Sequence, residues 1–255
     1  MNLVSPTYTK KHKSKVLAAL ILLLFVFNNF SLVLAQEQKP IVYLIPGQGA
    51  DYRLFKNIKI DTTFDVQYIN YVTPKKGCSM NDFARELSQQ IDTTRTFYLI
   101  GVSLGGMLAS EMGEFLHPEK IILISSAKQR KELPGGYRFQ KTIPFYKLVS
   151  GKLSKKGALL LQPIFEPDSK TDSTFTTMLK AKDPDFMKRT IAMIIEWDKA
   201  VHENNNIIHI HGEADNTIPV KNVKYDYLIK DGSHMMVLTR GEEISKLINK
   251  ILLSS

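Results

Sequence analysis

The chain has 255 residues, of which 44% are hydrophobic, 23% charged and 9% aromatic. This composition is ordinary for a globular protein of one large or two small domains, and it excludes a disordered, collagen-like or disulfide-stapled chain. Cys78 is the single cysteine, which excludes an intramolecular disulfide, a cysteine-based zinc site and an iron–sulfur cluster. The net charge of +9 is concentrated in residues 1–35 (+4) and 128–200 (+7). Because no stripe of basic residues interleaved with aromatics runs through the chain, we expect no nucleic-acid partner.

The first 35 residues have the order of a secretory signal peptide. Four lysines within residues 10–15 precede an apolar run over residues 16–27, and Val33 and Ala35 are small residues before a cut after Ala35. The alternative is an uncleaved anchor, since residues 16–35 are about as long as a membrane-spanning helix. Cleavage predicts a secreted or periplasmic protein, and retention predicts an N-terminally membrane-anchored one.

Apolar runs alternate with helical patterns along most of the remaining chain. We expect buried parallel strands over residues 41–45, 96–102, 120–124 and 206–211, and strands nearer an edge over residues 66–72 and 225–229. Amphipathic patterns predict helices over residues 80–91, 104–117 and 242–253. Strands that alternate with helices at these lengths predict an α/β fold with a mostly parallel sheet.

The alternation stops between residues 128 and 200. Asp183-Pro184-Asp185 has the signals of a helix start, namely a capping carboxylate, a proline at the first helical position and an acid in the first turn. The helix that follows is apolar on much of its circumference, so we expect it to pack on more than one side. We interpret residues 128–200 as a helical cap insertion over one end of a core formed by residues 36–127 and 201–255.

The pentapeptide Gly101-Val102-Ser103-Leu104-Gly105 lies between a predicted buried strand and a predicted helix. A G-x-S-x-G sequence in this context is typical of a nucleophile elbow, a tight turn that lifts a serine hydroxyl clear of the sheet. The positive end of the following helix then faces negative charge that develops on a substrate. The alternative is a glycine-rich turn with an incidental serine. We therefore predict that Ser103 is a nucleophile.

A serine nucleophile needs a base, and the base needs a carboxylate that orients it. Both occur downstream, in loops that follow predicted strands: Asp215 after residues 206–211, and His234 after residues 225–229. The order Ser, Asp, His is the one that nucleophile-elbow hydrolases use. Glu213 and Asp231 are rival acids. Asp215 is preferred because it stands past the glycine that ends the strand and before a proline that fixes the loop.

Two further histidines alternate on one predicted strand. His209 and His211 therefore share a face, where they could act as metal ligands. No third ligand lies near them in the sequence, so we interpret them as hydrogen-bonded core residues. We expect no metal and no organic cofactor.

Four motifs in order resemble the α/β-hydrolase superfamily over residues 40–253. They are Ile45-Pro46-Gly47-Gln48-Gly49, then G-V-S-L-G-G at the elbow, H-G-E-A-D-N-T-I-P around the acid, and G-S-H-M after the last strand. The stretch P-G-Q-G-A-D-Y-R-L-F is similar to the first-strand loop of a group of small bacterial hydrolases. The resemblance implies that the backbone N–H groups of Gln48 and Leu104 form an oxyanion hole. It also implies a sheet of about six strands, since the family often has two earlier antiparallel strands that this chain lacks.

These residues and the resemblance predict an extracytoplasmic serine hydrolase. The expected enzyme is carboxylesterase-like and cleaves a small-molecule acyl ester, with Ser103, His234 and Asp215 as the catalytic residues. The same residues would serve an acyltransferase, a thioesterase or a haloperoxidase. A lipase-like enzyme at a membrane surface and a non-catalytic binding protein on the same fold are the remaining alternatives.

The front of the predicted cap is strongly basic. Residues 128–156 hold nine basic side chains against Glu132 alone, and aromatic residues such as Tyr137, Phe139 and Phe145 are interleaved with them. One interpretation is a solvated face that keeps the protein soluble. The other is a surface for an anionic substrate, or for an anionic membrane or glycan.

Overall fold

The computed structural model describes residues 15, 20–21, 38–165, 173–200 and 206–254. The chain divides into two units, residues 1–38 and residues 39–255. Among the described residues, every buried hydrophobic side chain lies in the second unit, which therefore has a complete core of its own. The predicted leader falls almost wholly outside the described residues and stays a prediction. No described helix combines the length and the apolar character needed to cross a bilayer.

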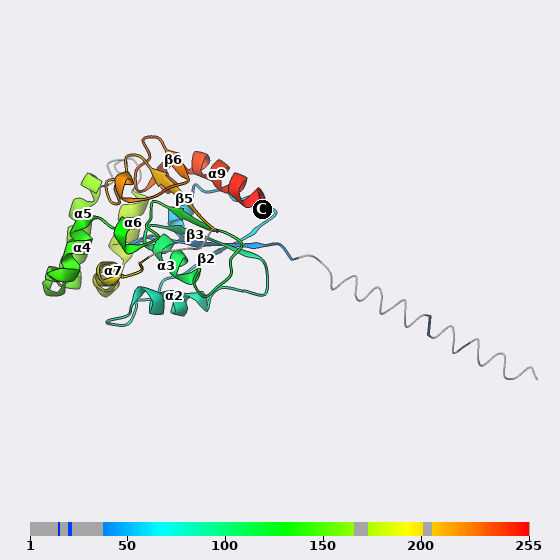
Figure 1. Ribbon diagram of the computed structural model, residues 1–255, viewed down its shortest axis with the longest axis horizontal. Coiled ribbons are helices and arrows are strands. Elements are labelled where there is room, and N and C mark those ends of the chain that lie inside the picture. The colour runs from blue at the N-terminus through cyan, green and yellow to red at the C-terminus, as the bar shows by residue number, and fades with distance from the viewer. Residues whose placement is uncertain (1–14, 16–19, 22–37, 166–172, 201–205, 255) are drawn as a thin grey trace, which may run out of the picture. The chain divides into compact units, whose positions relative to one another are not determined.

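Six strands form one sheet in which every neighbouring pair is parallel (Figure 1). The sheet order is β2-β1-β3-β4-β5-β6. The strands are β1 (Ile41–Ile45), β2 (Asp65–Tyr68), β3 (Phe97–Val102), β4 (Ile121–Ile124), β5 (Ile207–Gly212) and β6 (Tyr227–Ile229). The prediction of a mostly parallel sheet of about six strands is confirmed.

Alternate residues of the central strands pack against helices on the two faces of the sheet. Ile41, Tyr43 and Ile45 of β1 pack with α2 (Met80–Ser88) and α3 (Leu104–Met112) on one face. Val42 and Leu44 pack on the other face, with the short helix η1 (Tyr52–Phe55), α8 (Met236–Thr239) and α9 (Gly241–Leu253). A strand buried on both faces is a continuous apolar run, which is why the central strands are easy to find in the sequence.

Several predicted elements are shorter in the structure, and two of them end at least four residues early. The strand predicted over residues 66–72 is β2, which ends at Tyr68. The helix predicted to continue to residue 117 is α3, which ends at Met112 with Gly113 as its C-cap. Residues 113–116 then continue in tight turns, because the N–H groups of Phe115 and Leu116 both donate to the carbonyl of Met112. The apolar pattern persists through these turns because they still pack on the core.

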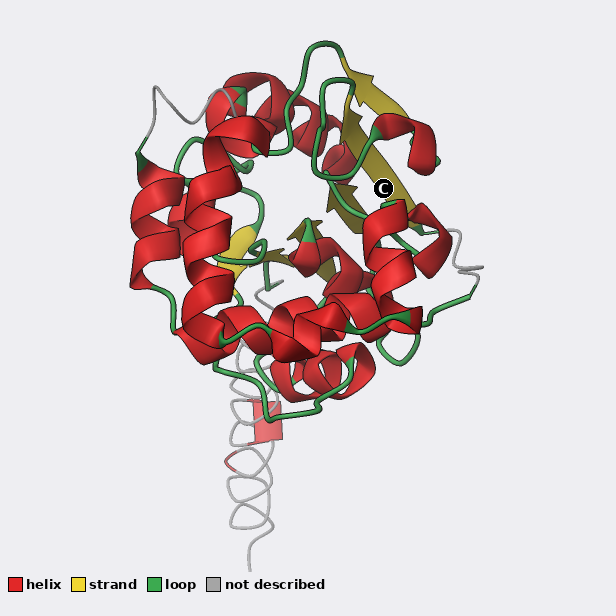
Figure 2. Cartoon of the chain, turned by 90° about the vertical axis from the view of Figure 1, so that its left-hand side faces the viewer, coloured by secondary structure: helices red, strands yellow, loops and turns green. Residues whose placement is uncertain are grey.

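Residues between β4 and β5 form the helical cap. Its elements are η2 (Arg130–Glu132), α4 (Gly135–Thr142), η3 (Phe145–Leu148), α5 (Gly151–Phe165), α6 (Thr174–Ala181) and α7 (Pro184–Glu196). Helix α7 starts where the sequence predicts, with the Asp183 side chain accepting from the N–H of Asp185 at 2.8 Å. It packs against α4, α5 and η3. The cap helices lie at one end of the sheet, as Figure 2 shows when that end faces the viewer.

The base of the cap is closed by contacts of Arg130. Its backbone N–H donates to the carbonyl of Lys199 at 2.9 Å. Its guanidinium donates to the carbonyl oxygens of Ile195 and Trp197. The two chain segments that connect the cap to β4 and β5 are therefore held side by side. A short helix η5 (Val220–Asn222) follows β5.

Candidate active site

Ser103 stands in a strained turn between β3 and α3. Its φ and ψ angles are 52° and −118°, a conformation that non-glycine residues rarely adopt. The turn is possible because its neighbours lack side chains. A Cβ on Gly105 would lie 2.1 Å from the carbonyl oxygen of Ile45, and a Cβ on Gly101 would lie 2.3 Å from that of Gly105. The glycines of the pentapeptide thus allow α3 to approach β1 and β3 closely enough for the turn to form.

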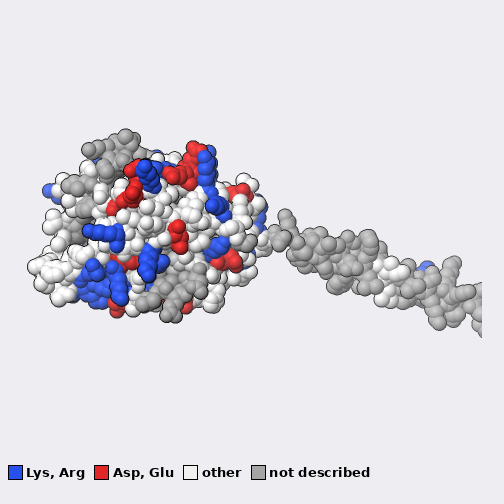
Figure 3. Space-filling view, turned by 45° about the horizontal axis from the view of Figure 1, so that its top comes forward, with Lys and Arg blue, Asp and Glu red and all other residues white. Residues whose placement is uncertain are grey.

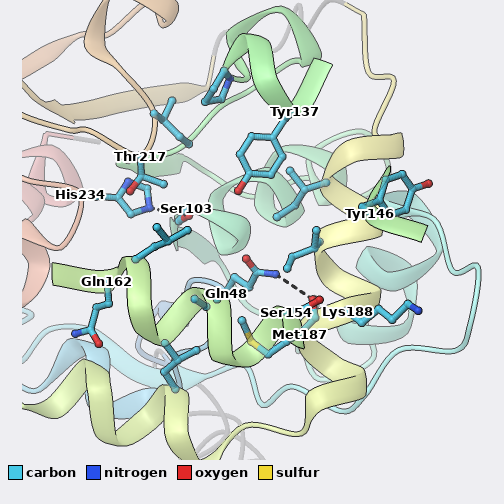
Figure 4. A pocket seen from close by; sticks show the side chains of 18 of the residues that line it. Gln48, Ser103, Tyr137, Tyr146, Ser154, Gln162, Met187, Lys188, Thr217 and His234 are labelled. Carbon is cyan, nitrogen blue, oxygen red and sulfur yellow. Dashed lines mark hydrogen bonds between the residues drawn. The ribbon is translucent and has the colours of Figure 1, made fainter. Parts of the chain in front are cut away.

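The structure brings together the three side chains that the sequence singles out. His234 Nε2 lies 3.0 Å from Ser103 Oγ, and His234 Nδ1 lies 2.8 Å from Asp215 Oδ2. Both contacts are satisfied when the Ser103 hydroxyl donates to Nε2 and the Nδ1–H donates to Asp215. They form a continuous chain from a hydroxyl through an imidazole to a buried carboxylate. Figure 4 shows Ser103 and His234 pointing toward one another at one end of a cavity.

Asp215 is held as a carboxylate by its surroundings. It is 3% exposed, and Oδ1 accepts from the backbone N–H groups of Thr217 and Ile218 at 2.9 and 2.8 Å. Burial by itself would raise the pKa of Asp215, but His234, His211 and the Ile218 N–H outweigh it, so the net shift of this pKa is downward. Of the rival acids, Glu213 is exposed and accepts from the backbone N–H of Asp231.

His211 is the site residue that the sequence reasoning missed. The interpretation of His209 and His211 as hydrogen-bonded core residues agrees with their complete burial. However, His211 Nε2 also lies 3.5 Å from Asp215 Oδ2, as well as 2.9 Å from the carbonyl of Ile218. Its position four residues before Asp215 does not by itself predict this contact, because the contact depends on the tight turn that ends β5.

The two histidines form a row of contacts between two backbone carbonyls. His209 Nδ1 lies 3.0 Å from the carbonyl of Lys224, and His209 Nε2 lies 3.2 Å from His211 Nδ1. Burial lowers the pKa of His209 to about 3 and also lowers the pKa of His211. Near neutral pH both rings are therefore uncharged, so the row has two N–H groups for three contacts and one contact lacks a hydrogen. The described residues contain no cluster of three or more potential metal ligands.

Gln48 lies in the loop after β1, directly beside the elbow. A Cβ on the preceding Gly47 would lie 3.3 Å from Ser103 Cβ. The Gln48 side chain points into the cap, where its Nε2 donates to Thr190 Oγ1 at 2.7 Å. Leu104 is the first residue of α3, so its N–H has no acceptor within the helix. Within the described part of the chain, the N–H groups of Gln48 and Leu104 have no protein acceptor.

A cavity of about 440 Å³ connects the Ser103 hydroxyl with the cap. Its walls are mostly apolar and come from α3, α4, α5, α6 and α7, with Leu133, Phe175, Leu179 and Ile194 among them. Figure 4 shows the side chain of Tyr137, from α4, pointing into this space. Burial raises the pKa of Tyr137, so its hydroxyl stays protonated and available as a donor.

Comparisons with known proteins agree with this architecture. The signature of an uncharacterised protein family (UPF0227) matches residues 56–136, and no curated protein matches the sequence. A lipase-esterase related protein from Clostridium acetobutylicum is similar in structure, with a TM-score of 0.63 and 14% identity over 84% of this chain and 95% of that one. A thermophilic esterase from Thermogutta terrifontis has a TM-score of 0.60 and 13% identity, over 85% of this chain and 90% of that one. A hydrolase from Pseudomonas aeruginosa has a TM-score of 0.63 and 14% identity, over 84% of this chain and 90% of that one.

These likenesses cover 84–85% of the chain at 13–14% sequence identity. The parallel six-stranded sheet, the strained turn after β3, and the acid and histidine loops after β5 and β6 occur in the expected order. The chain has the α/β-hydrolase fold.

Proposed function

We propose that this protein is an extracytoplasmic serine hydrolase that cleaves small carboxylic esters. The observation that carries the proposal is the chain of contacts from Ser103 Oγ through His234 to Asp215. A serine hydroxyl within hydrogen-bond distance of an imidazole that a carboxylate orients is the arrangement required for an activated serine nucleophile. The strained backbone of Ser103 supports the same role, because strain of this kind concentrates at functional sites.

The reaction would proceed in two steps. In the first, Ser103 Oγ attacks the ester carbonyl while His234 Nε2 takes the hydroxyl proton and then gives it to the departing alcohol, which leaves an acyl-serine. In the second, water attacks the acyl-serine and loses its proton to His234, and the acid departs as Ser103 regains its hydrogen. Asp215 holds the Nδ1–H of His234 throughout.

The negative oxygen of each tetrahedral intermediate needs donors that are already in place. The N–H groups of Gln48 and Leu104 suit this task, because they lie on either side of the elbow and have no protein acceptor among the described residues. Each such donor contributes about 3 to 4 kcal/mol to transition-state stabilisation in comparable sites. The positive end of the α3 helix dipole further stabilises the negative charge on this oxygen.

The cavity indicates the class of ester. Its walls are mostly aliphatic and aromatic, and its volume of about 440 Å³ is in the range of small-molecule sites. An acyl group of apolar character would bury its surface there, whereas a charged acyl group would be desolvated next to few partners. The named activities of similar folded chains, an esterase and a lipase-esterase related protein, are consistent with this substrate class.

Labelling with a fluorophosphonate tests the nucleophile. The wild-type protein should be labelled and the Ser103→Ala variant should not, whereas Ser154→Ala, which removes another hydroxyl that lines the same cavity, should be labelled as the wild type is. A series of nitrophenyl esters of increasing acyl length then tests turnover. Labelling that persists in Ser103→Ala would contradict the assignment. Labelling of the wild type without turnover of any ester would contradict ester hydrolysis and favour transfer to an acceptor other than water.

The location outside the cytoplasm is a separate part of the proposal. It rests on the basic, apolar and small-residue order of residues 1–35. Protein recovered from the periplasm or the medium should begin at Gln36, as intact mass measures. A mass that retains residues 1–35, in protein found with the membrane fraction, would instead support an N-terminal anchor.

A further inference from the structure

The outer side of the cap has a concentration of exposed apolar side chains. Thirteen large apolar side chains of the described part of residues 39–255 are strongly exposed. Seven of these lie in one stretch of the cap, residues 139–161. The seven are Phe139, Ile143, Phe145, Leu148, Leu153, Leu160 and Leu161. Single exposed apolar residues are normal in soluble proteins, but a group of them marks an interaction surface.

The exposure of η3 follows from how this short helix is held. Tyr146 is buried, and its hydroxyl donates to Glu196 Oε1 at the end of α7. Because residues three apart lie on the same side of a 3-10 helix, Phe145 and Leu148 both point away from α7. They are 59% and 86% exposed. A fixed buried anchor therefore presents these two side chains to the outside.

Helix α5 has two different faces. Ser154, Ala158 and Gln162, at a spacing of four residues, line the cavity. Lys152, Lys156 and Leu160 share the opposite half of the helix by the same periodicity, and all three are exposed. Leu153 lies at the border of the two faces, since it is exposed and also lines the cavity. The outer face of α5 thus alternates aliphatic and basic side chains.

The positive charge of this surface is not balanced within the cap segment. Glu132, the one acid among residues 128–156, is 2% exposed, and its carboxylate accepts from the backbone N–H of Lys128. Arg138, Lys152 and Lys156 are exposed and make no ion pair with any described carboxylate. Figure 3 shows basic side chains beside uncharged surface at the end of the molecule where the cap lies.

We propose that the outer surface of the cap docks on an anionic lipid bilayer. This outer cap surface consists of six apolar residues, Phe139, Ile143, Phe145, Leu148, Leu153 and Leu160, and three basic residues, Arg138, Lys152 and Lys156. Apolar side chains that enter the boundary of the acyl chains, next to basic side chains that meet the head groups, are the features by which a protein binds at a membrane interface. An anionic glycan would satisfy the basic side chains but would bury none of the apolar ones. The exposed leucines therefore favour lipid over glycan.

Docking in this orientation would bring the cavity to the bilayer. Leu153 and Leu161 are exposed and also line the cavity, so they lie at its mouth. An ester dissolved in the bilayer would then reach Ser103 without crossing water. This step rests on the proposed hydrolase function, whereas the docking itself does not.

Flotation with vesicles tests the docking directly. Residues 36–255 are used, because the core lies wholly within residues 39–255 and the apolar leader would bind lipid by itself. The protein should float with vesicles of phosphatidylcholine and phosphatidylglycerol, and weakly with phosphatidylcholine alone. The double variant Phe145→Ser with Leu148→Ser should bind about 100-fold more weakly, since two apolar side chains no longer leave water. Tyr52→Ser with Leu253→Ser, which removes two large apolar side chains that are exposed elsewhere, should bind as the wild type does.

Charge reversal and a fluorescent reporter test the orientation. Reversal of Arg138, Lys152 and Lys156 to Glu should abolish the preference for phosphatidylglycerol. In a Cys78→Ser background, an environment-sensitive fluorophore on Leu148→Cys should shift to the blue when vesicles are added, and the same fluorophore on Leu253→Cys should not. Ser103→Ala should float as the wild type does, which separates a failure of docking from a failure of the proposed reaction.

Three results would overturn the proposal. One is equal binding by the wild type and the Phe145→Ser, Leu148→Ser variant. Another is the absence of any flotation, which would leave the basic face as a solvated surface. The third is binding to a sulfated polysaccharide that the apolar substitutions do not change, without binding to vesicles, which would identify the surface as a glycan site.

Discussion

Asp215 differs from its neighbouring acids in what surrounds its carboxylate. It is buried between His234, His211 and two backbone N–H groups, whereas Glu213 is exposed. The Asp215→Asn variant should lower kcat by about 10,000-fold, because an amide stabilises neither the needed tautomer of His234 nor its charged form. Glu213→Gln should change kcat little. Steady-state kinetics on one ester measures both, and the opposite ranking would mean that Glu213 is the acid.

The buried histidines make stability depend on pH. The pKa values of His209 and His211 are lowered in the folded protein, to about 3 for His209, so the unfolded chain binds more protons once the pH falls below about 6.5. The free energy of unfolding should therefore fall as the pH is lowered from about 7 to about 4, by up to about 1.4 kcal/mol per pH unit for His209, and His211 should add to the fall.

Urea unfolding at several pH values measures this slope. His209→Gln should reduce the slope, because the amide cannot take up a proton. His117→Gln is the control, since His117 is exposed at the end of the α3 segment. A slope that His209→Gln leaves unchanged would contradict the prediction.

The serine, acid and histidine could be found from the sequence, but His211 could not. Ser103, Asp215 and His234 follow recognisable strands, and the carboxyl ends of parallel strands meet at one edge of the sheet. The approach of His211 to Asp215 depends on the path of the turn after β5, where the N–H of Asp215 donates to the carbonyl of Gly212. No periodicity predicts that path.

At the scale of elements, the elbow depends on the closeness of α3 to β1. Gly105→Ala would place a Cβ 2.1 Å from the carbonyl of Ile45, so this variant should lose several kcal/mol of stability. Gly157→Ala is the matched control, because a Cβ there meets nothing within 4 Å inside helix α5. That variant should gain about 0.5 to 1 kcal/mol. Chemical denaturation compares the two, and similar stabilities would contradict the close packing of the elbow.

The hydrogen bond from Gln48 to Thr190 connects the loop after β1 with helix α7. Thr190→Val keeps the shape of the side chain but removes the acceptor. It should lower kcat about tenfold with little change in KM, because the Gln48 N–H would no longer be held where the oxyanion forms.

Thr176→Val provides the comparison for this variant. It removes another threonine–glutamine hydrogen bond of the cap, from Thr176 Oγ1 to Gln162 Oε1. Its effect on kcat should be smaller than twofold. Equal losses in both variants would mean that Thr190 acts only by stabilising the cap.

Element boundaries were harder to predict than element types. The central strands are buried on both faces and stand out as apolar runs, but β2 lies at the sheet edge and ends four residues early. Within the cap, only the start of α7 was predicted, since Asp183 and Pro184 form a local signal. Two other cap helices lack such signals: α4 begins after Pro134 without a side-chain cap, and α6 likewise has none.

At the scale of the whole molecule, residues 39–255 hold the complete core. Removal of residues 1–35 should therefore leave the thermal midpoint of unfolding within about 1 °C, since one kcal/mol shifts Tm by roughly 2–4 °C at this size. The single tryptophan, Trp197, is a suitable probe, because it is buried and its indole N–H donates to Glu111. A large fall in the midpoint would show that the leader contributes to the folded unit.

Because the contacts of Arg130 hold the two ends of the cap together, the cap can be exchanged as one continuous segment of sequence. The segment leaves the sheet after β4 and returns at β5, its neighbour, and the contacts of Arg130 with Ile195, Trp197 and Lys199 fix both ends at one place. Ser103, Asp215 and His234 all lie outside it. A lineage could therefore replace the whole cap, and with it the walls of the cavity and the outer surface, in a single exchange of sequence. Under the proposed function, the reaction would stay the same while the choice of substrate changed.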